Sequence, residues 1–207
     1  MRYIMKLKFE PYRLILTALM LICVVASAKA VDISTHSSAG CAFPGTNQGQ
    51  SYTTTFGEDH DYGSSVSTMS FTIYNGAAWG GTATSSVTVD NRTGLMWVTN
   101  MVDAGMPSTS TLTWEGAITF CEGLNYAGFS DWRLSNIKEL VSIVDYSRQS
   151  PSINTAYFLN MQSNYYWSST TYVPTTTLAW YVYFNFGYVS LINKTLNYYV
   201  RCVRAGP

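Results

Sequence analysis

Histidine, charged residues and cysteine are scarce in this chain of 207 residues, and each shortage excludes a class of function. The chain has 2 histidines, His36 and His60, both in its irregular N-terminal third. A Ser-His-Asp or Cys-His site needs a histidine beside the nucleophile, so one of these two would have to reach the core. The sequence also has no glycine-rich phosphate loop and no zinc-ligand spacing. We therefore predict that the chain is not an enzyme.

Charged residues make up only 12% of the chain, and several of the basic ones stand at its start. They precede an apolar run, Leu14–Ala26, which is followed by the small-residue cleavage pattern Ala28-Lys29-Ala30. This arrangement predicts a secretory signal peptide over residues 1–30. The apolar run is too short for a membrane span, so none is expected after the signal is removed.

Removal of the predicted signal peptide changes the charge balance. It takes away five of the 12 Lys and Arg residues and one of the 12 Asp and Glu residues, which leaves 7 basic and 11 acidic residues. The resulting net charge of about −4 opposes binding to nucleic acid. About 177 residues remain, which is the size of one domain.

Three cysteines remain in the mature chain: Cys41, Cys121 and Cys202. Disulfides are favoured in extracytoplasmic proteins, and an odd count leaves one cysteine over. Cys121 falls on the apolar face of a predicted helix and Cys202 in the last predicted strand, and we predict that these two pair. Cys41 would then be free or bonded to a second chain. The alternative is that all three cysteines are reduced.

Two helical patterns lie on either side of the turn Asp131-Trp-Arg-Leu134. Thr113 is the predicted N-cap of the first, in which apolar residues recur every three or four positions over 114–124. Ser135 is the predicted N-cap of the second, which has an apolar stripe over 137–144. Strand patterns precede and follow this pair of helices.

The predicted strands are short and bounded by turn residues. They cover residues 67–74, 87–89, 95–98, 165–170, 179–185, 188–192 and 198–204, and Phe186-Gly187 marks a hairpin turn. Residues 31–56 are polar and irregular, and they are predicted to form an N-terminal arm before a domain over residues 57–207. The pattern predicts an α+β fold in which two helices pack on small antiparallel sheets.

Aromatic residues are 15% of the chain and crowd its last third. Alternation over 180–185 places Trp180, Val182 and Phe184 on a core face and tyrosines on the other face. Phenol side chains offer rigid contact area at low entropic cost. We therefore predict four exposed, ligand-binding tyrosines: Tyr172, Tyr181, Tyr183 and Tyr188. The alternative is that most of these tyrosines are core or sheet-face residues.

Two further groups of polar residues are candidate binding residues. Glu58, Asp59 and Asp61 would suit calcium, which takes oxygen ligands, although the run lacks the spacing of a calcium-binding loop and a solvated turn is the alternative. Arg204 is a candidate ligand contact. Strand alternation puts Arg201 and Arg204 on opposite faces, so we expect one of them to be a buried ion-pair partner.

Six blocks in order carry a family resemblance: Thr93–Trp97, Trp114–Cys121, Asp131–Leu134, Ile137–Leu140, Tyr166–Thr170 and Tyr199–Arg204. Over roughly residues 44–204 the chain resembles the Lcl C-terminal domain family, which is named after a bacterial collagen-like adhesin and is otherwise largely uncharacterised. The resemblance implies a bacterial domain that is secreted, periplasmic or on the cell surface. The adhesin's link to sulfated polysaccharides transfers poorly, because this mature chain is acidic. Ser135 departs from the family's usual proline.

The chain is more distantly similar to C-type-lectin-like domains, in which a cysteine of the first helix bonds to a C-terminal strand. It lacks their Glu-Pro-Asn, Gln-Pro-Asp and Trp-Asn-Asp sequences, so the usual calcium-dependent sugar site is not expected. We therefore expect a C-type-lectin-like, non-catalytic domain that binds glycans or another surface macromolecule in adhesion. The second hypothesis is a structural or self-associating envelope module, a homo-oligomer that uses Cys41 between chains.

Overall fold

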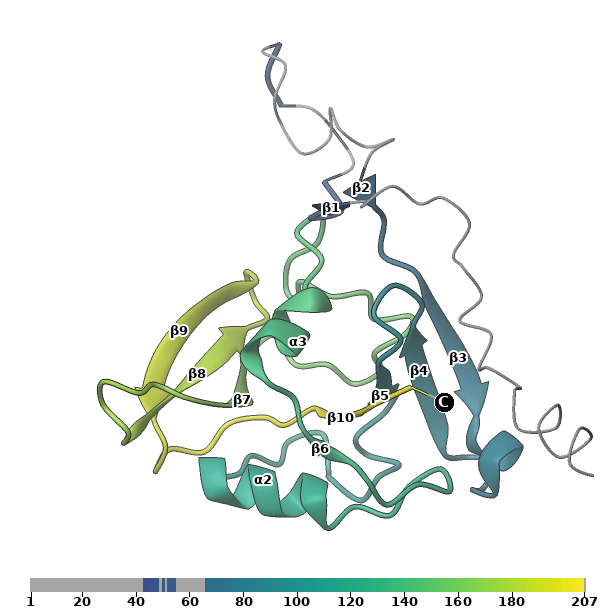
Figure 1. The fold of residues 1–207 in the computed structure, drawn as a ribbon. Helices are drawn as coiled ribbons and strands as arrows, with labels where there is room; N and C mark the ends of the chain where they lie inside the picture. Colours follow the sequence, from purple (N-terminus) through teal and green to yellow (C-terminus); the bar gives the residue numbers. More distant parts are fainter. Residues whose placement is uncertain (1–42, 49, 51, 55–65, 207) are drawn as a thin grey trace, which may run out of the picture. The chain divides into compact units, whose positions relative to one another are not determined.

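A computed structural model describes residues 43–48, 50, 52–54 and 66–206, all within one compact unit, Ala42–Pro207 (Figure 1). The predicted signal peptide, most of the predicted arm and the leftover Cys41 lie outside the described residues. The helices and strands form a mixed α+β fold, as predicted. A short parallel pair, β1 (Phe43–Pro44) and β2 (Val66–Ser67), precedes the two larger sheets.

The larger sheet has five strands in the order β3-β4-β5-β10-β6. Its strands are β3 (Phe71–Asn75), β4 (Ser86–Asp90), β5 (Met96–Val98), β6 (Arg133–Leu134) and β10 (Cys202–Arg204). The last strand, β10, pairs with β5 on one side and β6 on the other, both antiparallel. Trp97 and Val203 face each other in this register and are both fully buried. The sheet is therefore complete only once the C-terminal strand is in place.

The first predicted helix is α2 (Trp114–Glu122), and its N-cap is Thr113 as expected. The Thr113 side chain accepts a hydrogen bond from the backbone N–H of Gly116, and Glu115 lies in the first turn, where a carboxylate favours the helix dipole. Ala117 and Cys121 are fully buried on the inner face of the helix. The helix contacts β6 and β7.

The second helix, α3 (Ile137–Ser142), starts one residue later than predicted. Asn136 is its N-cap rather than Ser135, and a capping box joins the Asn136 side chain and backbone to Glu139. The Glu139 carboxylate also accepts two hydrogen bonds from the Arg133 guanidinium, at 2.6 and 2.7 Å. Arg133 is thus the partner of a carboxylate at the start of the helix.

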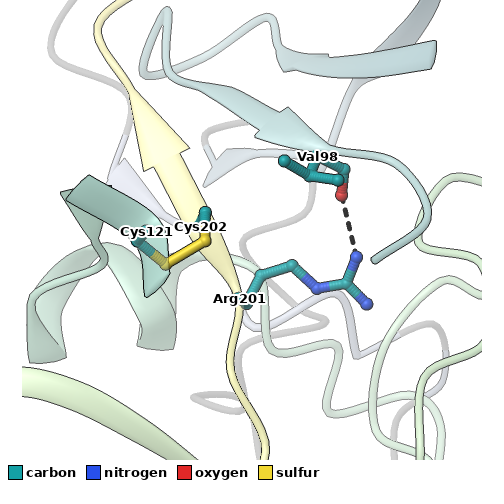
Figure 2. Close-up of a disulfide and its surroundings, with 4 residues drawn as sticks. All are labelled: Val98, Cys121, Arg201 and Cys202. Atoms are coloured by element: carbon teal, nitrogen blue, oxygen red, sulfur yellow. Dashed lines mark hydrogen bonds between the residues drawn. A yellow bond between two sulfur atoms is a disulfide. The ribbon is translucent and has the colours of Figure 1, made fainter. Parts of the chain in front are cut away.

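A buried disulfide joins Cys121 of α2 to Cys202 of β10, across a sequence separation of 81 residues (Figure 2). The predicted pairing is confirmed. Both cysteines belong to a cluster of buried apolar side chains that includes Trp132 and Trp167. The bridge therefore ties the first helix to β10, an inner strand of the five-stranded sheet, inside the core.

The smaller sheet has three antiparallel strands, β7 (Tyr165–Thr171), β8 (Leu178–Tyr183) and β9 (Tyr188–Asn193). One face of this sheet packs against α3: Val182 and Phe184 are fully buried in a cluster with Leu140 and Ile143. These core positions were expected for Val182 and Phe184, whereas Trp180 is only partly buried. The opposite face carries tyrosines.

Among the residues that the structure describes, no helix is long and apolar enough to cross a membrane.

The disulfide makes a direct stability prediction. Replacing both bonded cysteines, Cys121→Ser with Cys202→Ser, removes a cross-link across 81 residues. In the chain-entropy description this lowers the unfolding free energy by about 4–5 kcal/mol. Urea unfolding of the oxidised wild type and of the double variant measures the difference. Reductant should bring the wild type close to the double variant, and a wild type insensitive to reductant would contradict the expectation.

Candidate functional site

Five tyrosines gather on the face of the three-stranded sheet that points away from α3, and we call them the phenol cluster: Tyr165, Tyr181, Tyr183, Tyr188 and Tyr198. Strand register places three of them in a row. Tyr165 of β7 is opposite Tyr183 of β8, and Tyr183 is opposite Tyr188 of β9. Tyr181 follows on the same face two residues before Tyr183, since side chains alternate along a strand.

The rings of the phenol cluster contact one another closely. Tyr165 and Tyr183 are stacked with centroids 4.3 Å apart, and Tyr188 meets Tyr183 edge to face at 5.2 Å. Tyr198, which comes from the segment before β10, lies 5.1 Å from Tyr165. Pairs of this geometry contribute about 0.5–1.5 kcal/mol each beyond the area they bury. The cluster is therefore held by its own packing.

The exposure of these rings rises steadily toward the β8–β9 turn. Tyr181 is 6% exposed, Tyr183 is half-buried and Tyr188 is 44% exposed. Phe186, in the turn, is 59% exposed and its ring is 5.7 Å from that of Tyr183. We call Tyr183, Phe186 and Tyr188 the open end of the cluster. It presents aromatic rings to solvent on a backbone fixed by a hairpin.

Two hydroxyl groups of the cluster, those of Tyr188 and Tyr198, have a raised pKa. Desolvation and the neighbouring phenols of Tyr181, Tyr165 and Tyr183 raise the pKa of Tyr188 from 10.0 to about 12. Desolvation and two of the same neighbours also raise the pKa of Tyr198. The phenols of Tyr188 and Tyr198 therefore keep their protons through the physiological range, and each can both donate and accept a hydrogen bond.

The three strands that carry the cluster contain no Asp, Glu, Lys or Arg. Their sequences are YYWSSTT, LAWYVY and YVSLIN. A ligand at the open end would meet ring faces, ring edges and neutral hydroxyls. Such a surface suits apolar stacking and hydrogen bonding.

The expectation that Tyr181 is exposed is wrong. Its ring is buried because Tyr165 and Tyr198 lie over it, with centroid distances of 5.0 and 6.3 Å. The alternation argument assumed that one face of β8 meets solvent. In the structure both faces of this strand are covered near its centre. Alternation therefore predicts which face of the sheet a side chain is on, but it does not predict whether that side chain is exposed.

Tyr172 does not join the phenol cluster. It follows the last residue of β7, whereas Tyr165 begins that strand, so the two lie roughly 20 Å apart at 3.3 Å per residue. Its backbone N–H donates to Leu178, and its ring meets Trp180 edge to face at 5.8 Å. Tyr172 therefore belongs to the opposite end of the sheet.

Arg204 lies on the other sheet, in β10. Its guanidinium donates to both oxygens of Asp131, at 2.7 and 3.1 Å, and lies 3.8 Å from the centre of the Phe129 ring. The hydrogen bonds from Arg204 lower the pKa of the Asp131 carboxyl. The Arg204 side chain is 11% exposed and already engaged, so the structure separates it from the tyrosine candidates.

We predicted that one of Arg201 and Arg204 is both buried and part of an ion pair. In the structure, each arginine has one of these two properties. Arg204 makes the ion pair, while Arg201 is the fully buried one, at 1% exposure. Arg201 donates to the carbonyl oxygen of Val98 at 2.8 Å (Figure 2). It also donates to the carbonyl oxygen of Thr99 at 3.2 Å. The expectation that a buried arginine would pair with a carboxylate therefore does not hold for Arg201, because carbonyl oxygens of β5 take that place.

The predicted calcium ligands Glu58, Asp59 and Asp61 lie outside the described residues. Within residues 43–48, 50, 52–54 and 66–206, no group of three or more His, Cys, Asp or Glu side chains is arranged to hold a metal ion.

Three aromatic residues of the cluster and its open end were not selected from the sequence: Tyr165, Phe186 and Tyr198. The hairpin turn at Phe186-Gly187 places Tyr188 opposite Tyr183. The sequence therefore could have predicted that the turn residue Phe186 lies beside these two tyrosines. Tyr165 and Tyr198 depend on pairings between segments far apart in the chain, which no local pattern reports.

A comparison with known families finds that the sequence model of the Lcl C-terminal domain matches residues 86–204, more than half of the chain. The matched region runs from β4 to β10 and contains both bonded cysteines and the whole phenol cluster. It is narrower than residues 44–204, over which the sequence blocks suggested the resemblance, and it bears that resemblance out. No curated protein matches the chain.

The raised pKa of Tyr188 predicts a pH dependence. In the unfolded chain a phenol ionises near pH 10, whereas Tyr188 in the fold ionises near 12, so the unfolded state releases its proton first. The stability that Tyr188 contributes is complete below pH 10 and is lost as the pH rises toward 12. Urea unfolding at stepwise pH should show this loss, and Tyr188→Phe should make it shallower. A wild-type-minus-variant absorbance titration at 295 nm with a midpoint near 10 would contradict the assignment.

Proposed function

The chain belongs to the Lcl C-terminal domain family, and on that premise we propose that it is an exported, non-catalytic binding domain that recognises glycans of surface macromolecules in adhesion. The binding surface in this proposal is the open end of the phenol cluster. One observation carries it: Tyr183, Phe186 and Tyr188 present adjoining rings beside a turn, with the exposed ones at 59% and 44%.

The chemistry of the open end fits the face of a sugar ring. One side of a pyranose is lined by C–H groups and packs on an aromatic ring, while its hydroxyls need donors and acceptors at the rim. The phenols of Tyr183 and Tyr188 have hydroxyl groups that can act as both, and the raised pKa of Tyr188 keeps its proton in place. Tyrosine also loses little side-chain entropy on binding, and here neighbouring rings already restrict it.

The ligand in this proposal is a neutral glycan. The three strands offer no side chain with a full charge at neutral pH, so they supply no cation to a sulfate or a carboxylate. Without an ion pair, affinity should depend little on ionic strength. Acidic residues also outnumber basic ones after residue 30, and this negative net charge disfavours a negatively charged glycan.

We further propose that the fold is C-type-lectin-like. The support is the disulfide between the first helix of the pair and the final strand, together with the order of α2, α3 and a three-stranded antiparallel sheet. The same bridge supports export, since disulfides persist in oxidising compartments. Secretion through the predicted signal peptide, followed by a periplasmic or cell-surface location, is part of the same proposal.

A glycan array followed by titration of the strongest hit tests the proposed function. Tyr188→Ala removes an exposed ring and should weaken binding roughly five- to tenfold. Tyr188→Phe keeps the ring and loses only the hydroxyl, so its loss should be smaller. Tyr74→Ala is a matched control, because Tyr74 is 41% exposed against 44% for Tyr188 but lies on β3 of the other sheet.

Two results would contradict this proposal. An equal loss in Tyr74→Ala and Tyr188→Ala would move the binding surface away from the open end. No array signal, together with concentration-dependent assembly in sedimentation, would favour the second hypothesis of a self-associating envelope module.

A further inference from the structure

Arg201 carries a buried positive charge that no carboxylate neutralises in the part of the chain that the structure describes. Its Nη1 donates to the carbonyls of Val98 and Thr99. Its Nη2 donates to the Met161 sulfur at 2.7 Å and lies 3.5 Å from the carbonyl oxygen of Leu159. The ion pairs of the described residues all use other arginines. Every partner of this guanidinium is therefore formally neutral.

Burial of an uncompensated cation is costly. The effective penalty is several kcal/mol for each ion, and carbonyl dipoles offset only part of it. Burial lowers the pKa of Arg201, while the nearby Tyr166 opposes that shift. Guanidinium groups nonetheless keep their charge in proteins, so the cost is not avoided by deprotonation. In addition, the buried Nε of Arg201 has no hydrogen-bond partner.

A small cavity of about 20 Å³ lies against this residue. Arg201 lines it together with hydroxyl and amide side chains: Ser108, Ser110, Asn160, Tyr166 and Tyr199. Its remaining lining residues are apolar, and none carries a negative charge: Met101, Val102, Met106, Pro107 and Val200. Val102 and Ser108 are exposed, so the cavity lies at the protein surface. It is large enough for one small solvent species, since about 10–15 Å³ suffices for a water molecule.

We propose that this cavity binds one small monovalent anion, chloride in ordinary solutions, beside the Arg201 guanidinium. The O–H groups of Ser110, Tyr166 and Tyr199 can donate to such an ion, and its charge balances the buried cation. A water molecule would fill the space and leave the charge uncompensated.

The lining residues come from three separate stretches of the chain, 101–110, 160–166 and 199–201. An ion held among them adds contacts that exist only in the folded state. Binding should therefore raise the stability of the protein, and the increase should grow with the logarithm of the chloride concentration above the dissociation constant.

Thermal unfolding of the full chain in sodium chloride and in sodium gluconate, at matched ionic strength, tests the proposal. The midpoint should rise with chloride by a few degrees and stay flat with gluconate, a much bulkier anion. Crystals grown in sodium bromide should show one anomalous peak inside the cavity. Equal midpoints in both salts, with no such peak, would mean that the cavity holds water only and would overturn the proposal.

A peak in bromide crystals without any chloride dependence in solution would mean binding at crystal concentration only, and it would also overturn the proposal. Ser110→Ala removes one lining hydroxyl and keeps Arg201 in place, so it should fold and should need several-fold more chloride for the same midpoint shift. Ser190→Ala makes the same chemical change on β9, away from the cavity lining, and should respond to chloride as the wild type does.

Discussion

The C-terminal strand β10 is fixed inside the five-stranded sheet, between β5 and β6, by adjacent residues that act in different ways. Cys202 bonds covalently to α2, and Arg201 donates to carbonyls at the end of β5 (Figure 2). Both side chains are fully buried. Because β10 lies between β5 and β6, these bonds connect segments that precede and follow both helices. The rest of the described fold depends on this closure.

Closure of β10 also positions the residues just before it. Tyr199 bonds through its backbone to Tyr165 and Trp167 of β7, which links the two sheets. Tyr198 thereby lies over Tyr165 and Tyr181 and completes the buried part of the phenol cluster. The open end then rests on rings that cannot easily move. In the proposed function this matters, because a surface that is ordered before binding loses less entropy when a ligand arrives.

Much of the fold could be predicted from local sequence, because local patterns report local structure. The N-cap Thr113, the apolar spacing of α2 and the hairpin at Phe186-Gly187 each depend on residues within one or two turns of chain. The disulfide followed from which face of the helix carries Cys121. The second cap was placed one residue early, because Ser135 and Asn136 are both capping residues and only the reciprocal bond with Glu139 selects the latter.

The site was less predictable, because it depends on which strands pair. Alternation assigned Tyr181 to the correct face, but the coverage that buries it comes from Tyr198, a residue outside the sheet. One of Arg201 and Arg204 was expected to be a buried ion-pair partner, but which of them is buried, and that Arg201 bonds to a β5 carbonyl instead, depends on how β10 docks. The burial of Tyr181 and the partners of Arg201 cannot be predicted from the residues next to each of them in the sequence.

The most direct test of the account is an NMR titration of the isotopically labelled, oxidised protein with the tightest oligosaccharide found on an array. The account predicts that the largest shifts fall on the aromatic and backbone signals of Tyr183, Phe186 and Tyr188, with little change in β3. Shifts concentrated on β3, around Arg204 or spread evenly over both sheets would contradict it.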